Sequence, residues 1–378
     1  MIENHSFLSI GPLVFKHQVQ KIQIQERNAV EVLETTRSSK NFLVDSGEAE
    51  HKVQIRLLFT GESEINGSIN ENGTSGLRSL IALFRCCPIT TCNNSYIAES
   101  LREFEPDSKH TYLTKSARNI AITLNSLTLE TVPDMPFAIQ CTLVITKIDS
   151  GSVSLDGEIA YIGENSLDDI KYEGEDAFWL KKWINGLLDT HIIPEISNDD
   201  FSTIKATWYG VNTLDKPLEN TKHIFYANPI SKDDSYKSTT AIAESCTIQN
   251  RFSYTKLIGK GLPTPSHMGC SGRFLSLDLV FNNRLNYTDY IDFCAVKQVT
   301  DRIVRSPERA DRITGWSLET PLSKLLSTRT YNEGKGSFEL QSVFVPLSIF
   351  TEIGDEPDMI NCKIDMAENN INVDADTD

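Results

Sequence analysis

The sequence predicts an α+β protein that is mainly β, with two similar antiparallel β-sandwich or barrel domains and one helix flanking each. Three observations lead to this prediction. Apolar and polar residues alternate with a period of two in several segments, which is typical of half-buried strands. Apolar residues recur at helical spacing in a short segment after the first clear strand. The order strand, helix, strand–turn–strand then occurs a second time further along the chain.

The first domain is expected over residues 1–150. β-forming residues begin near Leu13 and continue to residue 33, before a polar turn at 35–40. The clearest strand follows, because its apolar residues occupy every second position. These apolar residues are Val53, Ile55, Leu57 and Phe59.

A helix and a second strand pair complete this domain. The loop at residues 61–73 is rich in Gly, Asn, Ser and Glu, so we expect it to be exposed. Leucines and other apolar residues at helical spacing predict a helix over 76–86, which Pro88 ends because proline lacks an N–H. Residues 120–148 return to strand chemistry, interrupted by the turn at 133–136.

Residues 151–245 form an intervening region of polar loops around one amphipathic helix, predicted over 176–189. Large aromatic side chains on so short a helix are typical of docking against a neighbouring surface. We therefore expect inter-subunit contacts here and in residues 62–75. The helix residues expected at that contact are Phe178, Trp179, Trp183 and Leu187.

The second domain is expected over residues 246–350. Its predicted elements are a strand at 275–281, a helix at 290–303 and two strands at 325–331 and 338–345. Residues 351–378 are strongly acidic, so we expect a flexible tail that does not fold alone.

The two domains read as an internal duplication. Residues 127–146 align without a gap on residues 326–345, at an offset of 199. This alignment keeps the phase of the apolar positions. Ile139, Cys141, Leu143 and Ile145 fall on Phe338, Leu340, Ser342 and Phe344. The alternative is a chance recurrence of a common α+β order.

Charge and cysteine content narrow the function classes. The formal net charge is −16, which argues against wrapping by duplex DNA, because DNA affinity comes from Lys and Arg on phosphates. No apolar run is long enough to predict a membrane helix. The eight cysteines are irregularly spaced in a chain of 378 residues, which favours a reducing place of synthesis over a disulfide scaffold.

No catalytic, cofactor or metal site is predicted. Cys86, Cys87 and Cys92 lack the further Cys or His pair that a zinc site needs. The histidines are scattered, no phosphate-binding glycine loop is present, and the acidic pairs 168–169 and 199–200 lie in polar loops. We therefore expect a protein that is not an enzyme.

The sequence SLTLETVPDMPFAIQCTL at 126–143 resembles the tail-tube domain of long-tailed bacteriophages and contractile injection machines. The resemblance extends over residues 45–148 and, more weakly, over 261–347. Two such domains in one chain resemble the baseplate hub of these tails. There, three chains make a pseudo-sixfold ring between the hexameric tail tube and a trimeric spike.

The resemblance implies a non-enzymatic virion protein of the tail baseplate, assembled in the host cytoplasm as a homotrimer. Its implied partners are the tail tube protein, the central spike and other baseplate proteins, with no membrane contact. DNA is expected to pass through an acidic channel without specific binding. Candidate channel-facing residues are Gln140, Thr142, Thr146, Glu339 and Gln341.

Two alternatives remain open from the sequence. A distal-tail or tube-terminator protein would form a ring of six chains in place of three. A receptor-binding or glycan-binding tail protein would use aromatic side chains to stack on sugar rings, and Trp208, Tyr209 and Tyr226 are the candidates.

Overall fold

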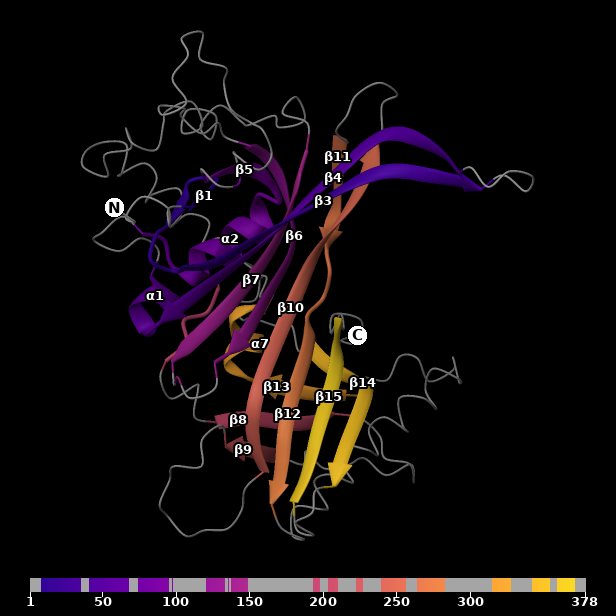
Figure 1. The fold of residues 1–378 in the computed structure, drawn as a ribbon. Coiled ribbons are helices and arrows are strands. Elements are labelled where there is room, and N and C mark those ends of the chain that lie inside the picture. The colour runs from indigo at the N-terminus through magenta and orange to yellow at the C-terminus, as the bar shows by residue number, and fades with distance from the viewer. Residues whose placement is uncertain are drawn as a thin grey trace, which may run out of the picture.

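The protein is mainly β, with fifteen strands in one large sheet and three short helices in the described part of the chain (Figure 1). The computed structural model describes residues 8–34, 41–67, 74–94, 97, 120–132, 135, 137–148, 193–197, 203–209, 222–226, 239–255, 264–282, 315–327, 342–353 and 359–370.

The strands fall into two sets, which we call the first unit and the second unit. The first unit contains β1 (Leu8–Ile10), β2 (Leu13–Phe15), β3 (Val19–Glu34), β4 (Asn41–Thr60), β5 (Ile89–Asn93), β6 (Ile120–Thr131) and β7 (Ala138–Lys147), with helices α1 (Glu62–Asn66) and α2 (Leu77–Cys86). The second unit contains β8 (Thr203–Tyr209), β9 (Lys222–Tyr226), β10 (Thr239–Thr255), β11 (Thr264–Cys270), β12 (Phe274–Asn282), β13 (Gly315–Glu319), β14 (Ser342–Ile353) and β15 (Met359–Asn370), with helix α7 (Pro321–Leu325).

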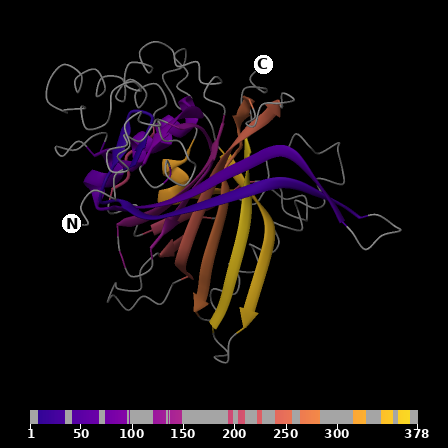
Figure 2. The same cartoon turned by 45° about the horizontal axis from the view of Figure 1, so that its top comes forward.

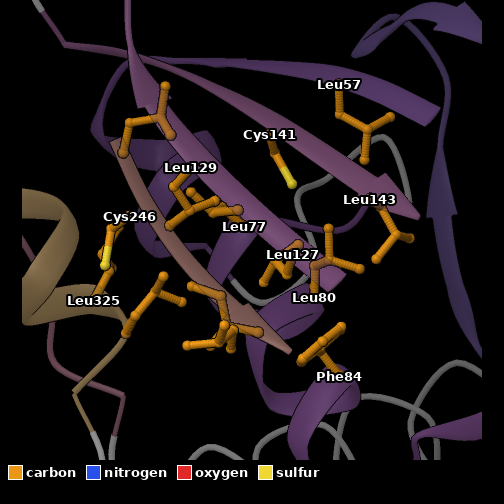
Figure 3. Packing of buried hydrophobic residues seen from close by; sticks show 14 of the residues in the cluster. Leu57, Leu77, Leu80, Phe84, Leu127, Leu129, Cys141, Leu143, Cys246 and Leu325 are labelled. Carbon is orange, nitrogen blue, oxygen red and sulfur yellow. The ribbon is translucent and has the colours of Figure 1, made fainter. Parts of the chain in front are cut away.

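The core of the first unit confirms the alternation seen in the sequence. Val53, Ile55, Leu57 and Phe59 on β4 are each at most 1% exposed, and α2 lies where the helical spacing predicted it. Figure 3 shows Leu77, Leu80 and Phe84 of α2 directed at Leu127 and Leu143 of the neighbouring strands. The apolar face of the sheet is therefore covered by the helix.

The sheet of the first unit curls back on itself. Its strand order is β3-β4-β7-β6-β5-β1-β2, so the first and last strands in space are joined by residues 16–18 alone. The rings of Phe15 on β2 and Phe59 on β4 meet edge to face, with centroids 6.1 Å apart. A connection this short forces the two ends of the sheet together around α2.

The second unit repeats this order strand for strand. Its order is β10-β12-β15-β14-β13-β8-β9, in which each strand has the place of its counterpart in the first unit. β4 corresponds to β11 and β12 together, since β10 pairs with both. Figures 1 and 2 show the long β3–β4 hairpin reaching beyond the rest of the sheet.

Irregularities in the strand pairing fix the spacing of the repeat. β3 shifts register against β4 between Val19 and Lys21, and β10 shifts against β12 between Ala241 and Ala243, which lie 222 positions later. The remaining shifts keep that spacing, as follows: Asn28/Val30 with Asn250/Phe252, and Leu124/Ser126 with Pro346/Ser348. β-bulges are local features that chance would not place at one common offset.

The offset of 199 expected from the sequence is therefore wrong. The counterparts of Ile139, Cys141, Leu143 and Ile145 are found by matching the β4–β7 register to the β12–β15 register. They are Ile360, Cys362, Ile364 and Met366.

The expectation of an acidic flexible tail over 351–378 is wrong for its described residues, 351–353 and 359–370, which are strands. Met359–Asn370 forms β15, which pairs with β12 on one side and β14 on the other. Buried Cys362, Ile364 and Met366 alternate with Asn361, Lys363 and Asp365, so the strand has one apolar face although the C-terminal segment is acidic.

Two further local predictions are corrected. A strand was expected at 325–331, but Leu325 ends the helix Pro321–Leu325, which forms because Thr320 accepts from the backbone N–H of Ser323 and Pro321 fits the first helical turn. Residues 326 and 327 are not in a strand, and 328–331 lie outside the described residues. The loop expected at 61–73 contains the short helix α1. The predicted helices at 176–189 and 290–303 lie outside the described residues.

Candidate functional site: the polar sheet face and the joint between the units

The face of the sheet away from α2 is polar and runs through both units. Residues directly opposite in antiparallel strands share a face, so the registers define rows across it. One such row joins Leu58, Gln140, Glu130, Ser245, Ser276, Asp365 and Ser348, from β4 to β14. The two units therefore present one continuous polar surface.

Side-chain hydrogen bonds link neighbouring strands along this face. Gln140 donates to Glu130 at 2.9 Å, and the hydroxyls of Thr128 and Thr247 are 2.9 Å apart. Asp365 accepts from the hydroxyl of Ser276 and from the hydroxyl of Ser348, both at 2.7 Å. Partial burial opposes ionisation of Asp365, but these two hydroxyls hold its pKa below the usual value.

The charges in these rows are of both signs. We expected an acidic channel lining, but the rows contain Lys and Arg beside Asp and Glu, without an acidic excess. The residues are Lys21, Lys52, Arg56 and Lys363 against Glu130, Asp278, Glu352 and Asp365. Such a mixed surface neither attracts nor strongly repels a polyanion.

The described residues among those predicted to face a channel differ in their exposure. Gln140 and Thr142 are half-buried on the polar face. Thr146 is only 5% exposed and accepts a hydrogen bond from Asn125 at 3.1 Å, so it does not line an open surface. Glu339 and Gln341 lie outside the described residues, as do Phe178, Trp179, Trp183 and Leu187. Trp208, Tyr209 and Tyr226 lie on β8 and β9, and their side chains are outside the described part.

The loop predicted to contact other subunits is bound within the chain where it is described. The side chain of Asn66 donates to the carbonyl of Ile196 at 2.7 Å and accepts from its N–H at 3.0 Å. Arg78 on α2 donates to the carbonyl of Ile193 at 2.6 Å. Residues 193–197 therefore occupy this surface.

The two units meet edge to edge at the β6–β10 joint. The segments Ser126–Glu130 and Ser245–Gln249 pair antiparallel, beside the stretch of β6 that pairs with β5. The hydroxyl of Thr131 accepts from the N–H of Glu244 at 2.9 Å. This joint makes the two sheets continuous, and Figure 3 shows Leu129, Cys246 and Leu325 in the shared core.

Buried polar groups reinforce the joint. The side chain of Asn250 donates to the carbonyls of Phe84 and Leu124, both at 2.9 Å, and so links β10 to α2 and β6. Arg85 on α2 donates to the carbonyl of Ser327 at 3.1 Å and to that of Leu326. Sequence reasoning missed these residues, because an isolated Asn or Arg gives no signal until its acceptors are known.

A buried ion pair holds the second unit together beside the joint. Arg273 and Glu368 have side chains 5% and 2% exposed, and two nitrogens of the guanidinium donate to the carboxylate at 2.6 and 2.9 Å. Arg273 also donates to the carbonyl of Ser323 and lies 4.9 Å from the ring centre of Phe344. The pair therefore connects β12, β15, α7 and β14.

Glu244 is the titratable group at the joint. It is 4% exposed, and burial raises its pKa to about 7, although the Thr320 hydroxyl and the N–H groups of Ser323 and Leu322 favour its ionised form. Its counterpart in the first unit is Ile22, so the first unit has no carboxyl at the equivalent position.

We expect Glu244→Gln to flatten the pH dependence of stability. The folded pKa lies above the unfolded value of 4.5, so the folded state binds the proton more tightly and stability falls as the pH rises from about 4.5 to about 7. That fall amounts to about 3 kcal/mol for this group. Urea unfolding between pH 5 and 8 measures it, with exposed Glu352→Gln as the control. An unchanged slope in Glu244→Gln would contradict this assignment.

The described residues contain no group of three or more His, Cys, Asp or Glu side chains able to hold a metal ion. Cys92 is buried, which raises its pKa to about 12, and burial also raises the pKa of Cys87. No helix in the described ranges is long and apolar enough to cross a bilayer.

The sequence matches no protein-family model, and no curated protein shows significant sequence similarity to it.

Proposed function

We propose that the protein is a structural component of a phage-type tail baseplate, a hub in which three chains form a ring of six similar units. The observation that carries this proposal is the repeat itself. One chain supplies two units with the same strand order and the same register shifts, joined edge to edge at the β6–β10 joint. A threefold ring of such chains has near-sixfold symmetry.

The adaptor role follows from this symmetry. A ring of three chains presents six similar surfaces to a hexameric tail tube and three identical surfaces to a trimeric spike. The tail-tube protein, the spike and other baseplate proteins are therefore the proposed partners, in the virion. Each unit would have the tail-tube fold that the sequence resembles.

The polar sheet face supports the proposed channel. Its amide, hydroxyl and mixed charged side chains form a continuous surface across the joint, so a ring of these sheets would have a polar lining. A lining without a net basic charge does not retain DNA, because retention requires Lys and Arg on phosphates. DNA would pass without specific binding.

The mass of the assembly tests the proposal. Light scattering of the purified chain is expected to give three times the chain mass of 42.4 kDa. A hexamer would instead support a distal-tail or tube-terminator ring. A protein that stays monomeric at high concentration and in the presence of tail tube protein would contradict both.

A further inference from the structure

Two edges of the described sheet, on β3 and β14, are the counterparts of the edges that form the β6–β10 joint. β3 corresponds to β10 and β14 corresponds to β6, by the common offset of 222. In the described sheet β3 pairs with β4 alone, and β14 pairs with β15 and, at Phe344, with β13. The edge of β14 beyond Phe344 thus corresponds to the edge of β6 that meets β10.

Side-chain exposure differs between these edges and the joint. At the joint, Cys246 of β10 and Leu127 of β6 are fully buried. Their counterparts, Ile24 of β3 and Ile349 of β14, are only partly buried. Phe350 is 66% exposed, and its counterpart Thr128 contacts Thr247. Apolar residues on a sheet edge that remain uncovered in one chain are typical of an interface.

We propose that β14 of one chain pairs with β3 of a second copy, in the register of the β6–β10 joint. Shifting each partner by 222 positions gives the pairs directly. Ser245↔Glu130, Thr247↔Thr128 and Gln249↔Ser126 become Gln23↔Glu352, Gln25↔Phe350 and Arg27↔Ser348. This inference rests on the proposed ring and supplies its interface.

A second copy fits these edges for two reasons. The contact is head-to-tail, so each chain offers one β3 edge and one β14 edge, and the contact repeats until the ring closes. The polar rows also continue across it, because Lys21 on β3 lies diagonal to Glu352 of the neighbour in this register. The charges at this end of the interface are therefore complementary.

The test is a cysteine pair, Gln25→Cys with Phe350→Cys. Both residues are exposed in the single chain, so the fold should tolerate the changes. The equivalent hydroxyls of Thr128 and Thr247 are 2.9 Å apart, so the two thiols should meet and form a disulfide between chains under mild oxidation. The control pair, Lys21→Cys with Phe350→Cys, lies on the same face but roughly 13 Å out of register.

Non-reducing gels read out the result. Most of the protein with the Gln25–Phe350 pair should run as covalent species of two and three chains. Little of the protein with the control pair, or of each single variant, should do so. The single variants account for native thiols such as exposed Cys270. Equal crosslinking of the control pair would overturn the proposed β14–β3 pairing while leaving the ring. The same holds if the Gln25–Phe350 pair gives no crosslink in a protein that light scattering shows to be trimeric. Crosslinks that extend well beyond three chains would support the joint and overturn the trimeric hub.

Discussion

Replacing Glu368 with alanine is expected to lower the free energy of unfolding by about 3–5 kcal/mol, because Arg273 is left charged and buried without its partner. Arg273 is 4% exposed and cannot reach water from its position between β12, β15 and α7. Denaturant unfolding, followed by tryptophan fluorescence, measures the change.

The double variant Arg273→Met with Glu368→Met is the control for this prediction. Removing both charges leaves no uncompensated ion, so much of the lost stability should return. A second control is Asp365→Asn, on the same strand but on the polar face, which should cost under about 1 kcal/mol. A Glu368→Ala protein as stable as the wild type would show that the pair is not buried as described.

Truncation after residue 358 should unfold the second unit. The deletion removes β15, which lies between β12 and β14 and buries Cys362, Ile364 and Met366. Burying side chains of this size contributes about 1.5–3 kcal/mol each, so their joint loss approaches the whole stability of a typical domain. Circular dichroism and solubility of the shortened chain measure this effect.

The matched truncation ends the chain after Asn370 and retains β15. It should fold like the full chain, although it also removes acidic residues. If both truncated chains were equally stable, the C-terminal acidic segment would be the dispensable tail that its composition indicates, and the place of β15 in the sheet would be wrong.

The strands with a clean alternation were predictable from the sequence, and α2 was predictable from its helical spacing. β4, β7 and β12 each carry unbroken apolar positions, and Gly76 and Pro88 flank α2. These signals are local, so they survive without knowledge of the partner strands. The tail-tube resemblance and the proposed hub function remain predictions.

The repeat spacing and β15 could not be read correctly from the sequence. The gapless alignment at an offset of 199 matched the apolar positions of one strand to those of another. Sliding that alignment by any even number of residues still matches apolar positions to apolar positions, because side chains alternate with a period of two. Only paired registers distinguish such shifts, because bulges such as Pro346/Ser348 depend on the partner strand. β15 was missed because most of the acidic residues of the C-terminal segment flank the strand, and the polar residues Asn361, Lys363 and Asp365 within it lower the mean hydropathy while leaving one face apolar.

The central claim is that one chain supplies two equivalent sheet units that close into a hollow ring. Electron micrographs of the purified full-length chain test it most directly. Class averages are expected to show six similar lobes around a central opening, with true threefold symmetry and sheets continuous from lobe to lobe. Particles without an opening, or with lobes that do not alternate between the two units, would contradict it.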